Sequence, residues 1–453
     1  MQALRVQAKF CLVTPGRLLH PAQLVIRHGR VVEVVQGRPS APHVDLGETL
    51  LIPGLVNAHT HLEFSQLPKP FPIGESFPSW ISQVVRYRAA QQTLEGADES
   101  RPPAARLRSA LHAGLLEAFH CGTTVLGDIV TAPWMPGDYP TAQQFAQRSI
   151  RRGVEGINQA TVARNSSGFP AEYWRSHLFP ISYPRVLPFT ELIGMTAERA
   201  MASWQWSKSA RSAASAELSI GTGVSPHAPY SIHFPTVVAA TESLPAATPV
   251  AMHVAESREE LQWLEQGQGA FGEAFSRLGM QAECAPPSVM QCIELLSRFQ
   301  RSLLIHGNYL NPVEIERIAA APNITVVYCP RTHHHFGHAT YPLQSLRDAG
   351  VSVILGTDSR ASNPSLSLWD EVHQAATQHP QRDPSEWLHS VTLAAAHALG
   401  IADDFGSLEI GRWATAVAIP VHADWRADNL IEALCDSSAE ELQMQPLGCL
   451  LKQ

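Results

Sequence analysis

The sequence predicts an α/β fold: a TIM-like (β/α)8 barrel that carries a small β-sandwich domain built from both ends of the chain. Through the middle of the chain, short apolar segments alternate with helical patterns, as parallel strands and their crossover helices do. Several of these segments end in histidine or aspartate. The eight expected barrel strands lie near residues 52–58, 123–129, 185–190, 220–226, 249–255, 302–306, 324–329 and 351–357.

The two ends of the chain differ from the middle in containing short strand and turn patterns. Residues 22–27 and 31–35 flank the turn His28–Gly29–Arg30, which is typical of a β-hairpin. Near the other end, residues 406–411 and 416–421 have a similar appearance. We therefore expect residues 1–53 and 401–453 to form the small β-sandwich domain, and residues 54–400 to form the barrel.

Two of the segments between expected strands, 62–122 and 130–184, are longer than one helix and its connections require. Both contain proline-rich and aromatic stretches. They are expected either to cover the mouth of the barrel or to pack against a neighbouring subunit.

Composition excludes several classes of protein. The 453 residues carry a formal net charge of −8 without long runs of one sign, so neither nucleic acid nor a membrane surface is expected as a partner. No signal peptide or apolar run of membrane-spanning length is recognisable, and seven scattered cysteines indicate reduced thiols. These features predict a cytoplasmic protein. A charged fraction of 16%, below the usual ~25%, is compatible with a homo-oligomer.

Four side chains at the ends of expected strands predict a metal site. His59 and His61 are two residues apart, so their side chains project from the same face of a strand. His253 and Asp358 come at the ends of two other strands. Three imidazoles and one carboxylate suit a single divalent ion with water at an open position. Zinc is the first expectation, with iron or manganese as alternatives.

Two further strand-end residues are candidates for catalysis. Glu256 precedes Ser257–Arg258–Glu259–Glu260, which fits a helix capping box, so Glu256 should lie at the barrel rim and could transfer a proton. His306 could be a fifth ligand or could hold the attacking water from outside the ligand set. The second role is favoured because no strand-end lysine is present to bridge a second metal.

The histidine-rich stretch His333–His334–His335, with His338, follows the expected seventh strand. The sequence favours a solvated loop here, and the alternative is that some of these side chains line the substrate pocket. Residues 267–272 spell G-x-G-x-x-G but follow a helical pattern rather than a strand, so a dinucleotide site is not expected.

Motifs over nearly the whole chain resemble those of the amidohydrolase superfamily, in its mononuclear deaminase-type branch. They lie at residues 51–61, 225–230, 253–256, 306–307, 329–330 and 356–359. The resemblance implies a metal bound by His59, His61, His253 and Asp358, with Glu256 as proton shuttle. It further implies that His306 orients the attacking water, that Asp358 accepts its proton, and that His227 contacts substrate.

Within this branch the chain is similar to aminodeoxyfutalosine deaminases and S-adenosylhomocysteine deaminases, through residues 61–65, Trp80, Arg88, 122–124 and 189–194. This similarity implies that Trp80, Arg88 and Glu191 line the pocket, Arg88 as a candidate partner for a substrate carboxylate. The alternatives are an exposed helix arginine and a structural carboxylate. Thr332–His333 replaces the Ser–Asn common in related deaminases, and residues 155–184 look expanded.

These observations predict a metal-dependent hydrolytic deaminase. Its small-molecule substrate would be an aromatic heterocycle with an exocyclic amino group, such as the adenine nucleoside derivative aminodeoxyfutalosine. One alternative is a hydrolase of the same fold that releases another leaving group, as a chlorohydrolase or amidase does. A non-catalytic scaffold is a more distant alternative, because every expected ligand is present.

Overall fold

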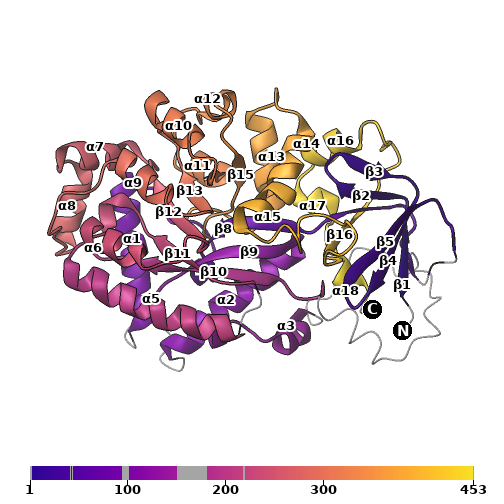
Figure 1. Cartoon of the computed structure of the whole chain (residues 1–453), viewed down its shortest axis with the longest axis horizontal. Helices are drawn as coiled ribbons and strands as arrows, with labels where there is room; N and C mark the ends of the chain where they lie inside the picture. Colours follow the sequence, from indigo (N-terminus) through magenta and orange to yellow (C-terminus); the bar gives the residue numbers. More distant parts are fainter. Residues whose placement is uncertain are drawn as a thin grey trace.

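A computed structural model describes residues 3–40, 42, 44–93, 102–149, 181–217 and 220–451. Figure 1 shows a large body of strands surrounded by helices, with the small sheets and both chain termini at one end of the molecule. No helix within the described ranges is long and apolar enough to cross a membrane. All seven cysteines are free, as the sequence predicts.

Eight parallel strands form the large sheet in strict chain order, which confirms the predicted (β/α)8 barrel. Each strand pairs with the next, and a backbone bridge between Thr60 and Asp358 joins the first strand to the last. The strands are β8 (Leu55–Thr60), β9 (Thr123–Val130), β10 (Arg185–Leu192), β11 (Gly223–Pro226), β12 (Val250–Val254), β13 (Ser302–His306), β14 (Ile324–Tyr328) and β15 (Val353–Leu355).

Helices connect the strands and cover the barrel. The sequence correctly places a helix start behind Glu256, where the Ser257 hydroxyl accepts a hydrogen bond from the Glu260 N–H. The helices are α1 (Phe77–Gln92), α2 (Pro103–His120), α3 (Ala142–Ser149), α5 (Ala197–Glu217), α6 (Phe234–Glu242), α7 (Arg258–Gln266), α8 (Ala270–Arg277), α9 (Val289–Leu296), α10 (Pro312–Ala319), α11 (Pro330–His335), α12 (Leu343–Asp348), α13 (Leu368–Gln378), α14 (Pro384–Ser390) and α15 (Leu393–Leu399). Short 3-10 turns occur at η1 (Leu62–Phe64), η2 (Pro136–Asp138) and η4 (Pro229–Ser231).

The small sheets combine strands from both ends of the chain, as predicted. One sheet has the order β5 (Arg30–Gln36), β4 (Ala22–Arg27), β1 (Leu4–Ala8), β6 (Val44–Asp45). The other has the order β17 (Gln445–Pro446), β16 (Ala416–Pro420), β7 (Thr49–Pro53), β2 (Phe10–Thr14), β3 (Arg17–Leu19). The expected 22–35 hairpin is present as β4 and β5.

Residues 406–411 form bends and a turn ahead of β16. The backbone N–H groups of Leu408 and Gly411 donate to the carbonyls of Val13 and Val31, which fasten this segment to the N-terminal strands. Beyond β16 the chain adds three short helices, α16 (Leu430–Asp436), α17 (Ala439–Leu442) and α18 (Leu447–Leu450).

Of the two long inter-strand segments, the first places α1 at the carboxyl ends of the barrel strands. The Trp80 indole on α1 donates a hydrogen bond to the carbonyl of Ala361, which follows β15. Arg88 on the same helix lies 3.3 Å from Glu191 near the end of β10. The α1 helix therefore covers part of the mouth. Most of the second segment, residues 150–180, lies outside the described residues.

Gly54 separates β7 in the small sheet from β8 in the barrel. Its N–H donates to the Thr415 carbonyl at 2.6 Å, so the backbones are in close contact. A Cβ at this position would lie 2.8 Å from the Thr415 oxygen and would overlap the side chain of Thr124. A side chain therefore does not fit at the junction between the two units.

The Gly54→Ala variant should accordingly lower the free energy of unfolding by about 1–3 kcal/mol through overpacking. Urea denaturation followed by circular dichroism would measure the loss. Gly16→Ala is the matched control, because nothing lies within 4 Å of a Cβ at Gly16. Equal stability of the two variants would contradict the expected steric constraint.

Candidate metal centre and active site

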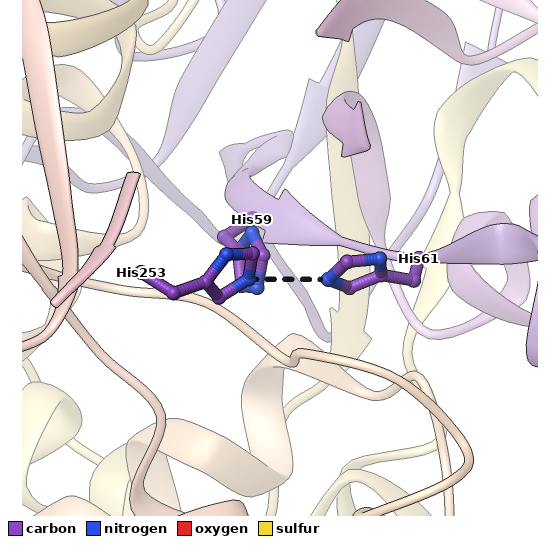
Figure 2. A group of neighbouring side chains, drawn as sticks. All are labelled: His59, His61 and His253. Carbon is purple, nitrogen blue, oxygen red and sulfur yellow. Dashed lines mark hydrogen bonds between the residues drawn. The ribbon is translucent and has the colours of Figure 1, made fainter. Parts of the chain in front are cut away.

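Three histidines converge at the carboxyl ends of the barrel strands. His59 lies at the end of β8, His61 directly follows that strand, and His253 lies on β12. Each offers a ring nitrogen within 4.8 Å of the others, and all three side chains are buried. In Figure 2 the imidazole of His61 faces those of His59 and His253, with 3.3 Å between the Nε2 atoms of His61 and His253.

The unsatisfied polar atoms of this cluster fit a metal ion. Both ring nitrogens of His59 and the Nδ1 of His61 are buried without a hydrogen-bond partner among the described residues. The Nδ1 of His253 lies 2.8 Å from the carbonyl oxygen of His227, an arrangement in which Nδ1–H donates and the Nε2 lone pair remains free. Burial and the neighbouring imidazoles lower the pKa values of His61 and His253. Neutral, buried imidazoles of this kind are good ligands for a divalent ion.

Asp358 adds a carboxylate to the histidines. Its Oδ1 lies 3.6 Å from Nε2 of His59 and 3.8 Å from Nε2 of His61. Its Oδ2 accepts a hydrogen bond from the Ser362 hydroxyl at 2.6 Å. Burial acts to raise the pKa of Asp358, but the nearby histidines outweigh burial and hold it well below the usual range. Oδ1 is therefore an ionised oxygen directed at the cluster.

Three strand ends near the site have the left-handed backbone conformation that non-glycine residues rarely adopt. The φ angles are 55° at Ala255, 71° at His306 and 55° at Asp358. Side chains hold these conformations: the Tyr341 hydroxyl donates to the His306 carbonyl, and the Thr60 hydroxyl donates to the Asp358 carbonyl. Such strained backbone commonly aims functional side chains.

Glu256 and His306 form a second pair beside the histidine cluster. The Oε1 of Glu256 lies 3.4 Å from Nε2 of His306, and both side chains are nearly fully buried. Burial, and secondarily the charges of Asp358 and Glu260, raise the pKa of Glu256 well above its usual value. Glu256 therefore has the character of a carboxyl that can hold and release a proton. The His306 ring lies 6.1 Å from that of His59, against 4.9 Å for His61 and His253.

An ionic cluster of Arg88, Glu63 and Glu191 lies beside His227. Arg88 donates to Oε1 of Glu63 at 2.6 Å and lies 3.3 Å from Oε2 of Glu191. Oε1 of Glu191 in turn lies 3.8 Å from Nε2 of His227. The structure thus brings three predicted pocket residues together and adds Glu63, which the sequence did not single out. With a side chain only 19% exposed, Arg88 is not an exposed helix arginine.

Trp80 contributes an aromatic wall. Its ring stacks on Phe77 at 5.7 Å and meets Phe336 edge-on at 5.1 Å. Because the indole N–H is held by the Ala361 carbonyl, the ring orientation is fixed. Trp80 and Phe77 on α1 therefore pack against Phe336, the residue that follows α11.

The prediction of a solvated loop at His333–His335 is wrong. Residues 330–335 form helix α11, and His333 is only 7% exposed because it packs beside Tyr328 and Tyr341. His334 is exposed, whereas His335 and His338 are partly buried. None of these four histidines belongs to the metal-binding group found in the described residues.

Comparison with known proteins gives a consistent result. The chain is 23% identical over 425 residues to an aminodeoxyfutalosine deaminase of Nitratiruptor sp. (90% of this chain, 89% of the relative). It is 25% identical over 433 residues to a 5-methylthioadenosine/S-adenosylhomocysteine deaminase of Syntrophobacter fumaroxidans (92% and 83%). The fold is similar to that of Helicobacter pylori aminofutalosine deaminase in complex with methylthio-coformycin, with a TM-score of 0.71, 19% identity and 96% of each chain covered.

A family model described as the amidohydrolase family matches residues 50–437. This range contains the whole barrel together with the histidine cluster, Glu256, His306 and Asp358. The resemblance inferred from the sequence motifs is thereby confirmed. The chain belongs to the amidohydrolase family.

Proposed function

We propose that this protein is a metal-dependent hydrolytic deaminase that removes the exocyclic amino group of an aromatic heterocycle. The observation that carries the proposal is the buried Glu256, with a raised pKa, beside three buried histidines and an aspartate with a lowered pKa. The names of the relatives support an adenine nucleoside derivative as substrate, such as aminodeoxyfutalosine or 5-methylthioadenosine.

His59, His61, His253 and Asp358 would hold a single divalent ion. When bound, such an ion lowers the pKa of water enough to supply a nucleophile near neutral pH. Their nitrogen and oxygen donors suit zinc, with iron or manganese as alternatives. The greater distance of the His306 ring from His59 supports its place outside the ligand set.

The chain's own residues would then perform the proton transfers. Asp358, which is ionised, accepts the proton of the attacking water. Glu256 protonates the ring nitrogen as the carbon–oxygen bond forms. Asp358 then returns its proton to the amino group, and ammonia leaves as the carbon–nitrogen bond breaks. The hydroxyl proton passes back to Glu256 as the carbonyl forms. His306, 3.4 Å from Glu256, orients the incoming oxygen. Water and amine are thus converted to a carbonyl product and ammonia.

Trp80 and His227 would complete the pocket beside the histidine cluster. Trp80 presents a fixed aromatic wall against which a planar heterocycle can pack. Burial, and secondarily Arg88, lower the pKa of His227 to about 3, so that its imidazole is neutral. A neutral imidazole can hydrogen-bond the substrate without adding charge.

The purified protein loaded with zinc should release one ammonia per substrate from at least one adenine nucleoside. Ammonia release, coupled to glutamate dehydrogenase, would be measured over adenosine, 5-methylthioadenosine, aminodeoxyfutalosine, guanine and cytosine. Chelation should abolish release and added metal should restore it, because Asp358 and the histidines act through the ion. Release of chloride from a chlorotriazine, or of an amine from an amide, without ammonia from any of these compounds would favour the alternative hydrolases.

Glu256→Gln should retain the metal but lower kcat by roughly 10²–10⁴-fold, because the amide preserves shape and cannot exchange a proton. Metal analysis and steady-state kinetics on the same preparation would separate the two effects. Glu265→Gln is the control, since Glu265 is an exposed carboxylate on the following helix α7. Near-normal turnover of the Glu256 variant would remove Glu256 from the mechanism.

Arg88→Gln should raise KM more than it lowers kcat. The substitution removes the cation that pairs with the buried carboxylates of Glu63 and Glu191. These groups lie beside His227 and are not the residues to which we assign the chemical step. We expect a rise in KM of roughly 10-fold, the equivalent of one lost charged contact. Arg88→Lys should recover part of the loss. A fall confined to kcat would instead assign Arg88 to the chemical step.

A further inference from the structure

The turn that follows His61 is held through both backbone groups of Leu62. The Leu62 N–H donates to Oδ1 of Asp128 at 2.9 Å. The Leu62 carbonyl accepts a hydrogen bond from the Ser65 hydroxyl at 2.7 Å, and the Leu62 side chain is fully buried. Since His61 and Leu62 share a peptide bond, fixing the Leu62 N–H also fixes the carbonyl end of His61.

Asp128 is a buried carboxylate that lacks an ion-pair partner in the described residues. It lies on β9 with no exposed surface, and its Oδ2 accepts a hydrogen bond from the Tyr139 hydroxyl at 2.6 Å. Burial raises the pKa of Asp128 to about 8 even though both hydrogen bonds act to lower it. Burying a carboxyl without a cation is unfavourable, so packing alone does not account for this residue type.

The pairing of β8 with β9 places Asp128 at the point where the turn begins. The register runs from Asn57–Leu126 to Thr60–Asp128, so β8 has one residue more than β9 between these pairs. This bulge lies around His59, immediately before the turn. Gly127 allows the close approach, because a Cβ there would lie 2.5 Å from the Ala58 carbonyl oxygen. Figure 1 shows the two strands side by side.

Tyr139 fixes Asp128 from the other side. Its ring meets Trp134 edge-on at 5.4 Å, and both rings belong to the same buried apolar cluster as Leu62. The Tyr139 hydroxyl therefore has a fixed position from which to hold the carboxylate. The connection after β9 and the turn after β8 are joined through one carboxyl group.

We propose that Asp128, held by Tyr139, is a positioning residue that fixes the His61 imidazole for metal binding. This inference rests on the proposed role of His61 as a ligand. The hydrogen bonds of the Asp128 carboxylate go to the Leu62 N–H and the Tyr139 hydroxyl, and none joins it to the histidine cluster in the described residues. It acts on His61 through the Leu62 peptide group, and loss of its carboxyl would let the imidazole move away from the position that binds metal.

Metal affinity tests this role independently of catalysis. Zinc affinity would be measured by chelator competition for the wild type and for Asp128→Ala, Asp128→Asn, Tyr139→Phe and His61→Ala. Asp128→Ala should weaken zinc binding roughly 10–100-fold, the usual effect of removing a group that orients a ligand. Tyr139→Phe should have a smaller effect. Asp128→Asn should recover part of the affinity, because its amide oxygen can still accept from Leu62.

Substitution of zinc by cobalt adds a spectroscopic measure. The d–d absorption of the cobalt form should change in Asp128→Ala, as the ligand geometry changes, but not in the control Tyr183→Phe. Tyr183 is a suitable control because its hydroxyl donates to the carbonyl of Pro140, close to Tyr139 in sequence, instead of to Asp128. Thermal melts of the metal-free proteins would report changes in stability.

Unchanged zinc affinity and an unchanged cobalt spectrum in Asp128→Ala would overturn the proposal, even if the protein melts at a lower temperature. Should that variant fail to fold, the same result for both Asp128→Asn and Tyr139→Phe would overturn it. If His61→Ala binds zinc as tightly as wild type, the assigned ligand set itself is wrong. Loss of zinc affinity in the Asp128 variants, together with an absence of deaminase activity in the zinc-loaded wild type, would sustain the positioning role and reject the proposed reaction.

Discussion

The closure of the barrel between its first and last strands is the contact on which the site depends. His59 lies on β8 and His61 directly follows it, whereas Asp358 follows β15, almost 300 residues later. The backbone N–H of Asp358 donates to the His59 carbonyl, and the Thr60 hydroxyl donates to the Asp358 carbonyl. The side chain of Asn57 reinforces this contact by donating to the Thr357 hydroxyl. Because the contact is made mainly by backbone groups, the ligand positions follow from the fold itself.

The second constraint is the difference in pKa between two neighbouring carboxyl groups, those of Asp358 and Glu256. Asp358 is surrounded by imidazoles that stabilise its ionised form, so its pKa is low. Glu256 has burial and other carboxylates around it, so its pKa is high. Two carboxyl groups with opposite shifts can act as base and acid at the same pH. Arg88, by contrast, is paired with Glu63 and Glu191.

Much of this arrangement could be predicted from the sequence, because the signals were local. Each apolar run predicted a strand, and the polar residue at its end predicted a candidate metal ligand, as at His253 and Asp358. The cluster of Glu63, Arg88 and Glu191 was only partly foreseeable, since η1, α1 and β10 meet only in the fold. His333 was misjudged because three consecutive histidines suggest solvent, whereas one face of a helix can bury a single imidazole.

The strained strand ends explain why buried polar side chains surround the histidine cluster. Left-handed conformations at Ala255, His306 and Asp358 cost of order 1–3 kcal/mol each, so isolated strands would not adopt them. They persist because buried side chains fix the adjoining peptide groups: Glu260 accepts from the Ala255 N–H, and Tyr341 donates to the His306 carbonyl. Each group that fixes a strand end lies outside the ligand set, as Asp128 does for His61. The geometry of the site is therefore maintained by a surrounding layer of buried polar residues, and the proposed role of Asp128 extends this layer to metal binding.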